Sequence, residues 1–141
     1  MRIDRQQAAQ RLERARVARL ATVGRDEQPH LVPVTFAAVG EGVERIVTAV
    51  DHKPKTTTAL RRIRNIERNP RVCLLADHYE EDWQRLWWVR ADGRARTLAA
   101  TRAPELVRAL GAKYEQYRRH PPEGALIVIE VTNVTGWSAG Q

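Results

Sequence analysis

Apolar residues recur with the helical period in three segments of the chain. In the first, Asp4 can cap a helix and Gln7 occupies the reciprocal capping position three residues later. The same period runs through residues 56–68 and 104–119. The pattern therefore predicts three helices, each of which buries one face.

Seven further segments have the apolar alternation and the β-branched or aromatic content of strands. They are residues 17–23, 30–39, 44–50, 71–78, 85–91, 94–100 and 125–137. Short turn-rich segments separate the first three, which predicts an antiparallel meander. Asp92-Gly93 separates the fifth and sixth, and this dipeptide favours a hairpin turn because both central positions need a positive φ.

Strands in this number, without alternating helices, favour a closed or partly closed barrel. We expect one mainly β domain of the α+β class over residues 1–141, with the three helices inserted between antiparallel strands. Pro33 removes a backbone donor from the second strand. That strand is therefore expected to lie at an edge, to contain a bulge or to approach a ligand.

The chain is basic, with 24 lysines and arginines against 17 acidic residues and a formal charge of +7. The basic residues are dispersed and form no nucleic-acid motif, so we expect anionic small molecules as partners and no nucleic acid. Cys73 lies in the apolar run VCLLA and is expected in the core, without a disulfide partner. No apolar run is long enough to span a membrane, and the first residues lack a signal peptide's apolar centre, which favours the cytoplasm.

The usual catalytic signatures are missing from the sequence. The glycines form no phosphate-binding loop, and the four histidines have no metal-ligand spacing, so no metal site is expected. The sequence identifies no catalytic residue, although His78 and Tyr79 are possible proton donors. If the protein is an enzyme, a cofactor carries the reaction.

The stretch VDHKPKTTT offers a physical mechanism for binding an anion. Lys53 and Lys55 flank Pro54, and Thr56 stands where the second helix begins. The ammonium groups, the threonine hydroxyl and the unpaired N–H groups of a first helical turn would all favour a phosphate. A solvated basic loop with Thr56 as a simple cap is the alternative, and the residues alone leave both interpretations open.

Several segments resemble a known family. RLATVGRDEQPHLVPVTFAAV, TAVDHKPKTT, NIERNPRVCLLADHYEEDW and RLWWVRADGRAR together look like the flavin-binding proteins related to pyridoxamine 5′-phosphate oxidase. Among these, the sequence is most similar to the actinobacterial branch that binds the deazaflavin coenzyme F-420. The resemblance implies a six- to seven-stranded split β-barrel that forms a homodimer, with cofactor sites between the protomers.

The resemblance also implies which residues bind the cofactor. The phosphate would be held by Lys53, Lys55 and Thr56, and the ring would lie along Pro33, Val34 and Thr35, backed by Thr48, Ala49 and Val50. Trp137 resembles an aromatic residue that approaches the site, sometimes from the other subunit. The arginines of the second helix, Arg61 and Arg64 in particular, can follow the anionic tail of the deazaflavin, and which of Arg61, Arg62 and Arg64 reach the cofactor is left open.

The function implied is an oxidoreductase that moves a hydride between coenzyme F-420 and a small unsaturated organic substrate. Two alternatives remain on the same fold. One is an oxidoreductase that depends on flavin mononucleotide (FMN), and the other is a non-catalytic protein that binds a flavin or a tetrapyrrole.

Overall fold

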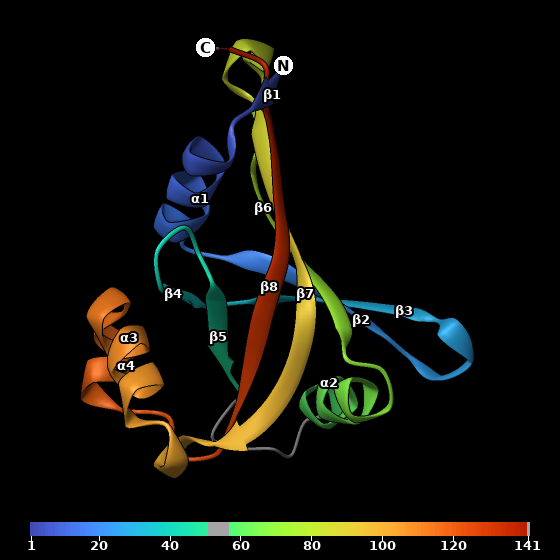
Figure 1. Cartoon of the computed structure of the whole chain (residues 1–141), viewed down its shortest axis with the longest axis vertical. Coiled ribbons are helices and arrows are strands. Elements are labelled where there is room, and N and C mark those ends of the chain that lie inside the picture. The colour runs from blue at the N-terminus through green and yellow to red at the C-terminus, as the bar shows by residue number, and fades with distance from the viewer. Residues whose placement is uncertain (51–56, 141) are drawn as a thin grey trace.

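A long antiparallel pair of strands, β7 (Trp87–Ala99) and β8 (Ala125–Ser138), runs through the centre of the molecule (Figure 1). The computed structural model describes residues 1–50 and 57–140. The other strands in these residues are β1 (Arg2–Ile3), β2 (Ala18–Val23), β3 (Pro29–Val34), β4 (Ala37–Val39), β5 (Arg45–Ala49) and β6 (Arg71–His78). The α-helices are α1 (Arg5–Arg14), α2 (Thr57–Arg68), α3 (Pro104–Lys113) and α4 (Glu115–Arg119).

The strands form one sheet in the order β3-β2-β6-β7-β8-β5-β4, and β1 also pairs with β8. Every pairing is antiparallel, and the end strands β3 and β4 do not pair with each other, so the sheet is open. This confirms the predicted mainly β fold and is consistent with a split barrel. The described residues contain eight strands and four α-helices, where the sequence predicted six to seven strands and three helices.

Two buried clusters hold the helices to the sheet. The larger one packs α1 against β7 and β8 and extends over the inner face of β2 and β6, with Leu12, Leu20 and Leu74 fully buried. The smaller one packs α3 against β5 and β8 through Leu106 and Leu110. Asp4 and Gln7 form the predicted capping box at the start of α1, which stabilises the helix by satisfying its first N–H groups.

The predicted Asp92-Gly93 hairpin is wrong. Both residues lie inside the continuous strand β7, where the pairing with β8 shifts register between them. A Cβ atom at Gly93 would lie only 2.4 Å from the Glu130 carbonyl oxygen, so glycine is needed for close approach of the two strands. The dipeptide marks a β-bulge and not a turn.

The predicted meander is also wrong in part. The segment 30–39 divides into β3, which pairs with β2, and β4, which pairs with β5 at the other end of the sheet. Thr35 and Phe36 connect these two strands, and Phe36 is fully buried. Pro33 lies on the edge strand β3, which is the first of the three positions expected for it.

Two smaller differences concern single residues. The predicted helix over 104–119 is divided by the extended backbone of Tyr114. Cys73 is half-buried on β6 and not fully inside the core, and burial with the nearby Asp92 carboxylate raises its pKa. No helix in the described residues combines the length and apolar character needed to cross a bilayer.

Candidate functional site

The crossover of Thr35 and Phe36 is fixed by hydrogen bonds from distant parts of the chain. Thr48 Oγ1 on β5 donates to the Thr35 carbonyl oxygen over 2.7 Å. The Phe36 N–H donates to the hydroxyl of Tyr114 over 3.2 Å, and that hydroxyl in turn donates to the Arg16 carbonyl oxygen over 2.9 Å. The extended backbone at Tyr114, between α3 and α4, accompanies these contacts.

A cavity of about 210 Å³ lies beside this crossover. It is lined by Pro33, Val34, Thr35, Thr48, Ala49, Val50, Arg62 and Tyr117. The structure thus brings together all six strand residues that the resemblance assigns to the ring of a cofactor. We refer to this space as the crossover cavity.

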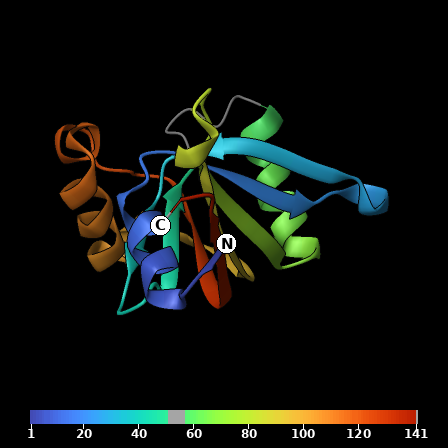
Figure 2. The same ribbon diagram turned by 90° about the horizontal axis from the view of Figure 1, so that it is seen from above.

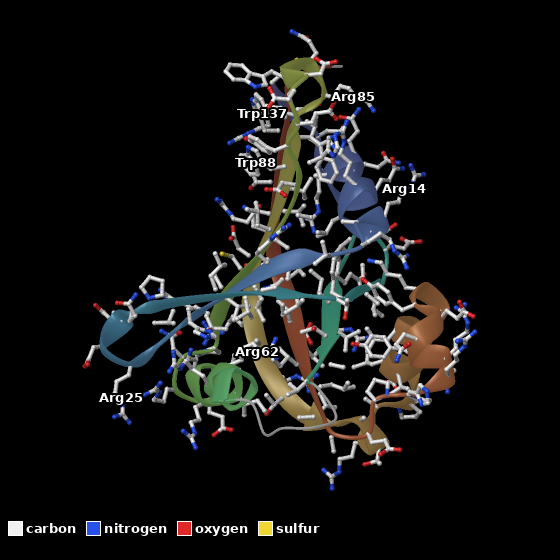
Figure 3. All side chains as sticks on the ribbon, turned by 180° about the vertical axis from the view of Figure 1, so that it is seen from behind. Arg14, Arg25, Arg62, Arg85, Trp88 and Trp137 are labelled. Atoms are coloured by element: carbon white, nitrogen blue, oxygen red, sulfur yellow. The ribbon has the colours of Figure 1, made fainter. Side chains whose placement is uncertain are left out.

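Arg62 and Tyr117 complete the crossover cavity. Arg62 is one of the three arginines left open for cofactor contact, whereas the sequence assigned Tyr117 no role in the site. Tyr117 has the spacing of the apolar residues of its helix, but its hydroxyl lies 3.0 Å from Thr35 Oγ1. Arg62 is one of several arginines on α2, and Figure 3 shows its side chain between α2 and the sheet. Helical periodicity indicates that Arg61 and Arg62 differ in direction, but only the packing of α2 shows which one faces the cavity.

The hydroxyl pair of Thr35 and Tyr117 has hydrogen-bonding capacity to spare. Two hydroxyls carry two donor hydrogens, and one of these is used within the pair. The other hydrogen and several lone pairs remain for a molecule in the cavity. The Tyr114 hydroxyl, by contrast, already accepts one hydrogen bond and donates another.

Arg61 and Arg64 lie in a second cavity, of about 400 Å³, between α2 and the β2–β3 hairpin. Figures 1 and 2 both show this hairpin projecting beside α2. The second cavity is lined by Gly24, Arg25, Gln28, Pro29, His30, Arg61, Arg64, Asn65 and Arg68. The two cavities share no lining residue, so the structure separates Arg61 and Arg64 from the six strand residues.

The remaining predicted site residues do not lie in the crossover cavity as the structure describes it. Lys53, Lys55 and Thr56 fall outside the described residues. Trp137 pairs with Trp88 near one end of β8, whereas Arg62 lies toward the other end of the molecule (Figure 3).

The possible proton donors from the sequence are also remote from the cavity. His78 contacts the Glu80 carboxylate, and Tyr79 is 63% exposed beyond the end of β6. Neither side chain lines the crossover cavity. Within residues 1–50 and 57–140, no group of His, Cys, Asp and Glu side chains could hold a metal ion.

A family model described as pyridoxamine 5′-phosphate oxidase matches residues 4–138 of the chain. No curated protein is similar enough to the chain to count as a match. The residues matched by the family model include every described residue that lines the two cavities.

Solved structures resemble the fold over nearly the whole chain. An FAD-binding protein from Mesorhizobium loti is 20% identical, with 96% of this chain and 93% of that chain covered at a TM-score of 0.73. An FAD-binding protein from Mycobacterium smegmatis is 18% identical, with 97% and 96% covered at 0.64. A heme-binding protein from the same organism is 18% identical at 0.74, with 99% of this chain but only 56% of that chain covered. At these identities the likeness is one of fold.

Proposed function

The chain belongs to the pyridoxamine 5′-phosphate oxidase family, and we propose that it is an oxidoreductase that binds a flavin-type cofactor at the crossover cavity. One observation carries this proposal. The six residues expected along the cofactor ring, which come from the ends of β3 and β5 and the residue after each, line a single cavity together with Arg62 and Tyr117.

The chemistry of the lining residues fits a flat conjugated ring with polar edges. Pro33, Val34, Ala49 and Val50 offer apolar contact, while Arg62 and the Thr35 and Tyr117 hydroxyls offer polar contacts. Ligand sites commonly combine mostly apolar walls with a few convergent polar groups. Thr48 is committed to the Thr35 carbonyl oxygen, so its role is to hold the shape of the crossover.

The size of the cavity supports a site shared between two protomers. Its volume of about 210 Å³ lies below the range of roughly 300 to 1,000 Å³ that is common for ligand pockets. We therefore propose a homodimer in which the partner covers the open side of the ring. Trp137, which lies far from the cavity of its own chain, would serve the partner's site.

We propose coenzyme F-420 as the cofactor, with FMN as the alternative. F-420 carries an anionic tail beyond its phosphate, and α2 presents several arginines next to the segment that contains Lys53 and Lys55. When bound, the deazaflavin would supply a hydride to a small unsaturated organic substrate. The protein's own residues would hold the phosphate through Lys53, Lys55 and Thr56 and orient the ring against β3 and β5.

Equilibrium titration of the purified protein with F-420 and with FMN, followed by cofactor fluorescence, tests the proposal. We expect F-420 to bind more tightly than FMN. Replacing Lys53 and Lys55 together by alanine should weaken F-420 binding at least about tenfold, because charge-assisted hydrogen bonds to phosphate are strong. Replacing Arg14 and Arg102, which are exposed, removes the same charge and should leave the affinity nearly unchanged.

The outcomes separate the candidate functions. Tight FMN binding without F-420 binding would favour the FMN-dependent alternative. Binding of F-420 with no oxidation of the reduced cofactor by enones, quinones or nitro compounds would favour a carrier protein. Binding of neither cofactor would contradict the proposal as a whole.

A further inference from the structure

The cavity between α2 and the β2–β3 hairpin is strongly basic. Arg25 comes from the tip of the hairpin, and Arg61, Arg64 and Arg68 come from α2. No acidic residue is among the described residues that line this cavity of about 400 Å³. Its volume lies within the usual range of ligand sites. We call it the arginine cavity.

The arginines of this cavity form no ion pairs within the part of the chain that the structure describes. This holds for Arg25, Arg61, Arg64 and Arg68 alike. Like charges that share a cavity repel one another, and the repulsion is strongest where water is excluded. A bound anion would remove this repulsion and gain several charge-assisted hydrogen bonds.

The walls of the arginine cavity are held in place by a buried hydrogen-bonded chain. Arg68 Nη2 donates to Asn65 Oδ1 over 3.0 Å, and Asn65 Nδ2 donates to Thr22 Oγ1 over 3.0 Å. Asn65 and Thr22 are both buried, at 1% and 3% exposure. This chain ties α2 to β2, so the helix arginines and the hairpin are fixed relative to each other before any ligand arrives.

His30 provides a second, independent sign that the cavity suits an anion. Its Nδ1 atom is buried and has no hydrogen-bond partner among the described residues. Burial lowers the pKa of His30, and the positive charges of Arg61 and Arg62 on α2 lower it further. Arg25 of the hairpin lines the same cavity, whereas Thr22, opposite His30 on β2, is uncharged. An anion among these groups would oppose the arginines and make the imidazolium easier to form.

We propose that the arginine cavity binds an oxyanion ligand with two or more negative charges, such as a diphosphate, at a site distinct from the crossover cavity. Two sources share this chemistry: a free phosphorylated metabolite, or the anionic end of a cofactor whose ring lies in the crossover cavity. Arg61 and Arg62 are consecutive on α2 and line different cavities, which places the two sites next to adjacent faces of the same helix.

Isothermal titration of the purified protein with inorganic pyrophosphate tests this proposal. We expect Arg64→Ala to weaken binding at least about tenfold, since it removes a charge-assisted contact. Arg14→Ala is the matched control, because it removes the same charge from an exposed position on α1 and should leave binding nearly unchanged. Equal affinity in the Arg64→Ala variant and the wild type, or no binding to the wild type, would overturn the proposal.

The NMR titration of His30 gives a readout that depends on neither variant. Saturating pyrophosphate should raise the pKa of His30, while the ring signals of His120, which is exposed beyond α4, should not move when pyrophosphate is added at fixed pH. The His30→Gln variant assigns the signal. An unchanged His30 pKa at saturation would show that pyrophosphate binds elsewhere and would contradict the proposal.

A competition experiment distinguishes the two sources. If F-420 displaces pyrophosphate, the anionic end of the cofactor occupies the arginine cavity, and if both bind together, the occupant is a free metabolite. The cofactor source rests on the proposed function, whereas the anion site itself does not. Pyrophosphate can bind where no cofactor does, and a cofactor can bind where pyrophosphate does not.

Discussion

At the scale of single residues, the sequence predicted the residues of the crossover cavity around β3 and β5, but it did not assign the two that come from helices, Arg62 and Tyr117. The six strand residues could be assigned through the resemblance, and Pro33 marked an edge strand by its missing donor. The role of Tyr117 in the site could not be predicted, because a tyrosine at an apolar helical position usually contributes its ring to a core. Its ring does pack against the smaller cluster, and only the fold brings its hydroxyl to Thr35.

The Thr35 and Tyr117 hydroxyls give a prediction at this scale that rests on the proposed function. Tyr117→Phe keeps the ring and removes the hydroxyl, and Thr35→Val keeps the side-chain shape. Each should weaken F-420 binding about three- to tenfold, which corresponds to one hydrogen bond of about 1 kcal/mol. Fluorescence titration measures the affinity, and chemical denaturation checks that stability has not changed.

The double variant tests whether the two hydroxyls act as a unit. If they share one donor hydrogen toward the ligand, Thr35→Val with Tyr117→Phe should lose little more affinity than either single variant. Losses that add fully would show that each hydroxyl binds the cofactor by itself. No loss in any variant would exclude the pair from the site.

At the scale of elements, the periodicity of the sequence predicted most helices and strands correctly, but not how the strands connect. The helical face of α2 and the capping box of α1 follow from local spacing, which the structure preserves. The predictions of a turn at Asp92-Gly93 and of a single strand over residues 30–39 are wrong because both conformations depend on partners distant in sequence. The conformation at Gly93 is set by its close approach to β8, and that of the Thr35–Phe36 crossover is set by hydrogen bonds with Thr48 and Tyr114.

Gly93 therefore gives the prediction at the scale of elements. In Gly93→Ala the new Cβ would lie 2.4 Å from the Glu130 carbonyl oxygen and 2.7 Å from Ile129 Cγ2, so β7 and β8 must separate locally. We expect a loss of about 2 kcal/mol in the free energy of unfolding, as for overpacked sites in general. Urea denaturation measures the loss.

Gly124 offers a matched control for this substitution. A Cβ atom there meets no atom within 4 Å, and its φ is not in the left-handed region. Gly124→Ala should therefore be neutral or stabilise the protein by up to about 1 kcal/mol through the unfolded chain. A Gly93→Ala variant as stable as Gly124→Ala would show that the strand pair adjusts without cost.

At the scale of the whole molecule, both faces of β5 and β8 are buried, one in each cluster, with α3 packed on one of them. On β2, β6 and the first half of β7, only one face is buried in the core, and the side chains of the other face remain half-buried without a covering helix. The uncovered face of β2, β6 and β7 presents Ala21, Cys73, Leu75, Trp88 and Arg90, which line two shallow cavities. Because paired residues point to the same side of a sheet, Trp137 lies on this face next to Trp88. Aromatic residues and arginine are enriched in protein interfaces.

We predict that this face forms the interface of a homodimer. From the sequence, a dimer was expected only because of the resemblance to the family. We expect the 16.1 kDa chain to sediment at twice its mass. Leu75→Glu should shift it to the monomer, because a buried carboxylate at an interface is costly, whereas in the monomer the new side chain would lie beside Arg19 and Arg90. Ala112→Glu adds the same charge on the exposed surface of α3 and should leave the dimer intact.

The same variant links assembly to the cofactor. If the crossover cavity of one protomer is completed by the other, Leu75→Glu should lose most F-420 affinity, although Leu75 does not line that cavity. Raising the concentration of the variant until dimers reappear should restore binding, which a simple folding defect would not allow. Full affinity in a monomer would show that one chain holds the cofactor alone. Pyrophosphate binding at the arginine cavity should persist in the monomer, because the volume of about 400 Å³ already lies within the usual range of ligand sites without a partner.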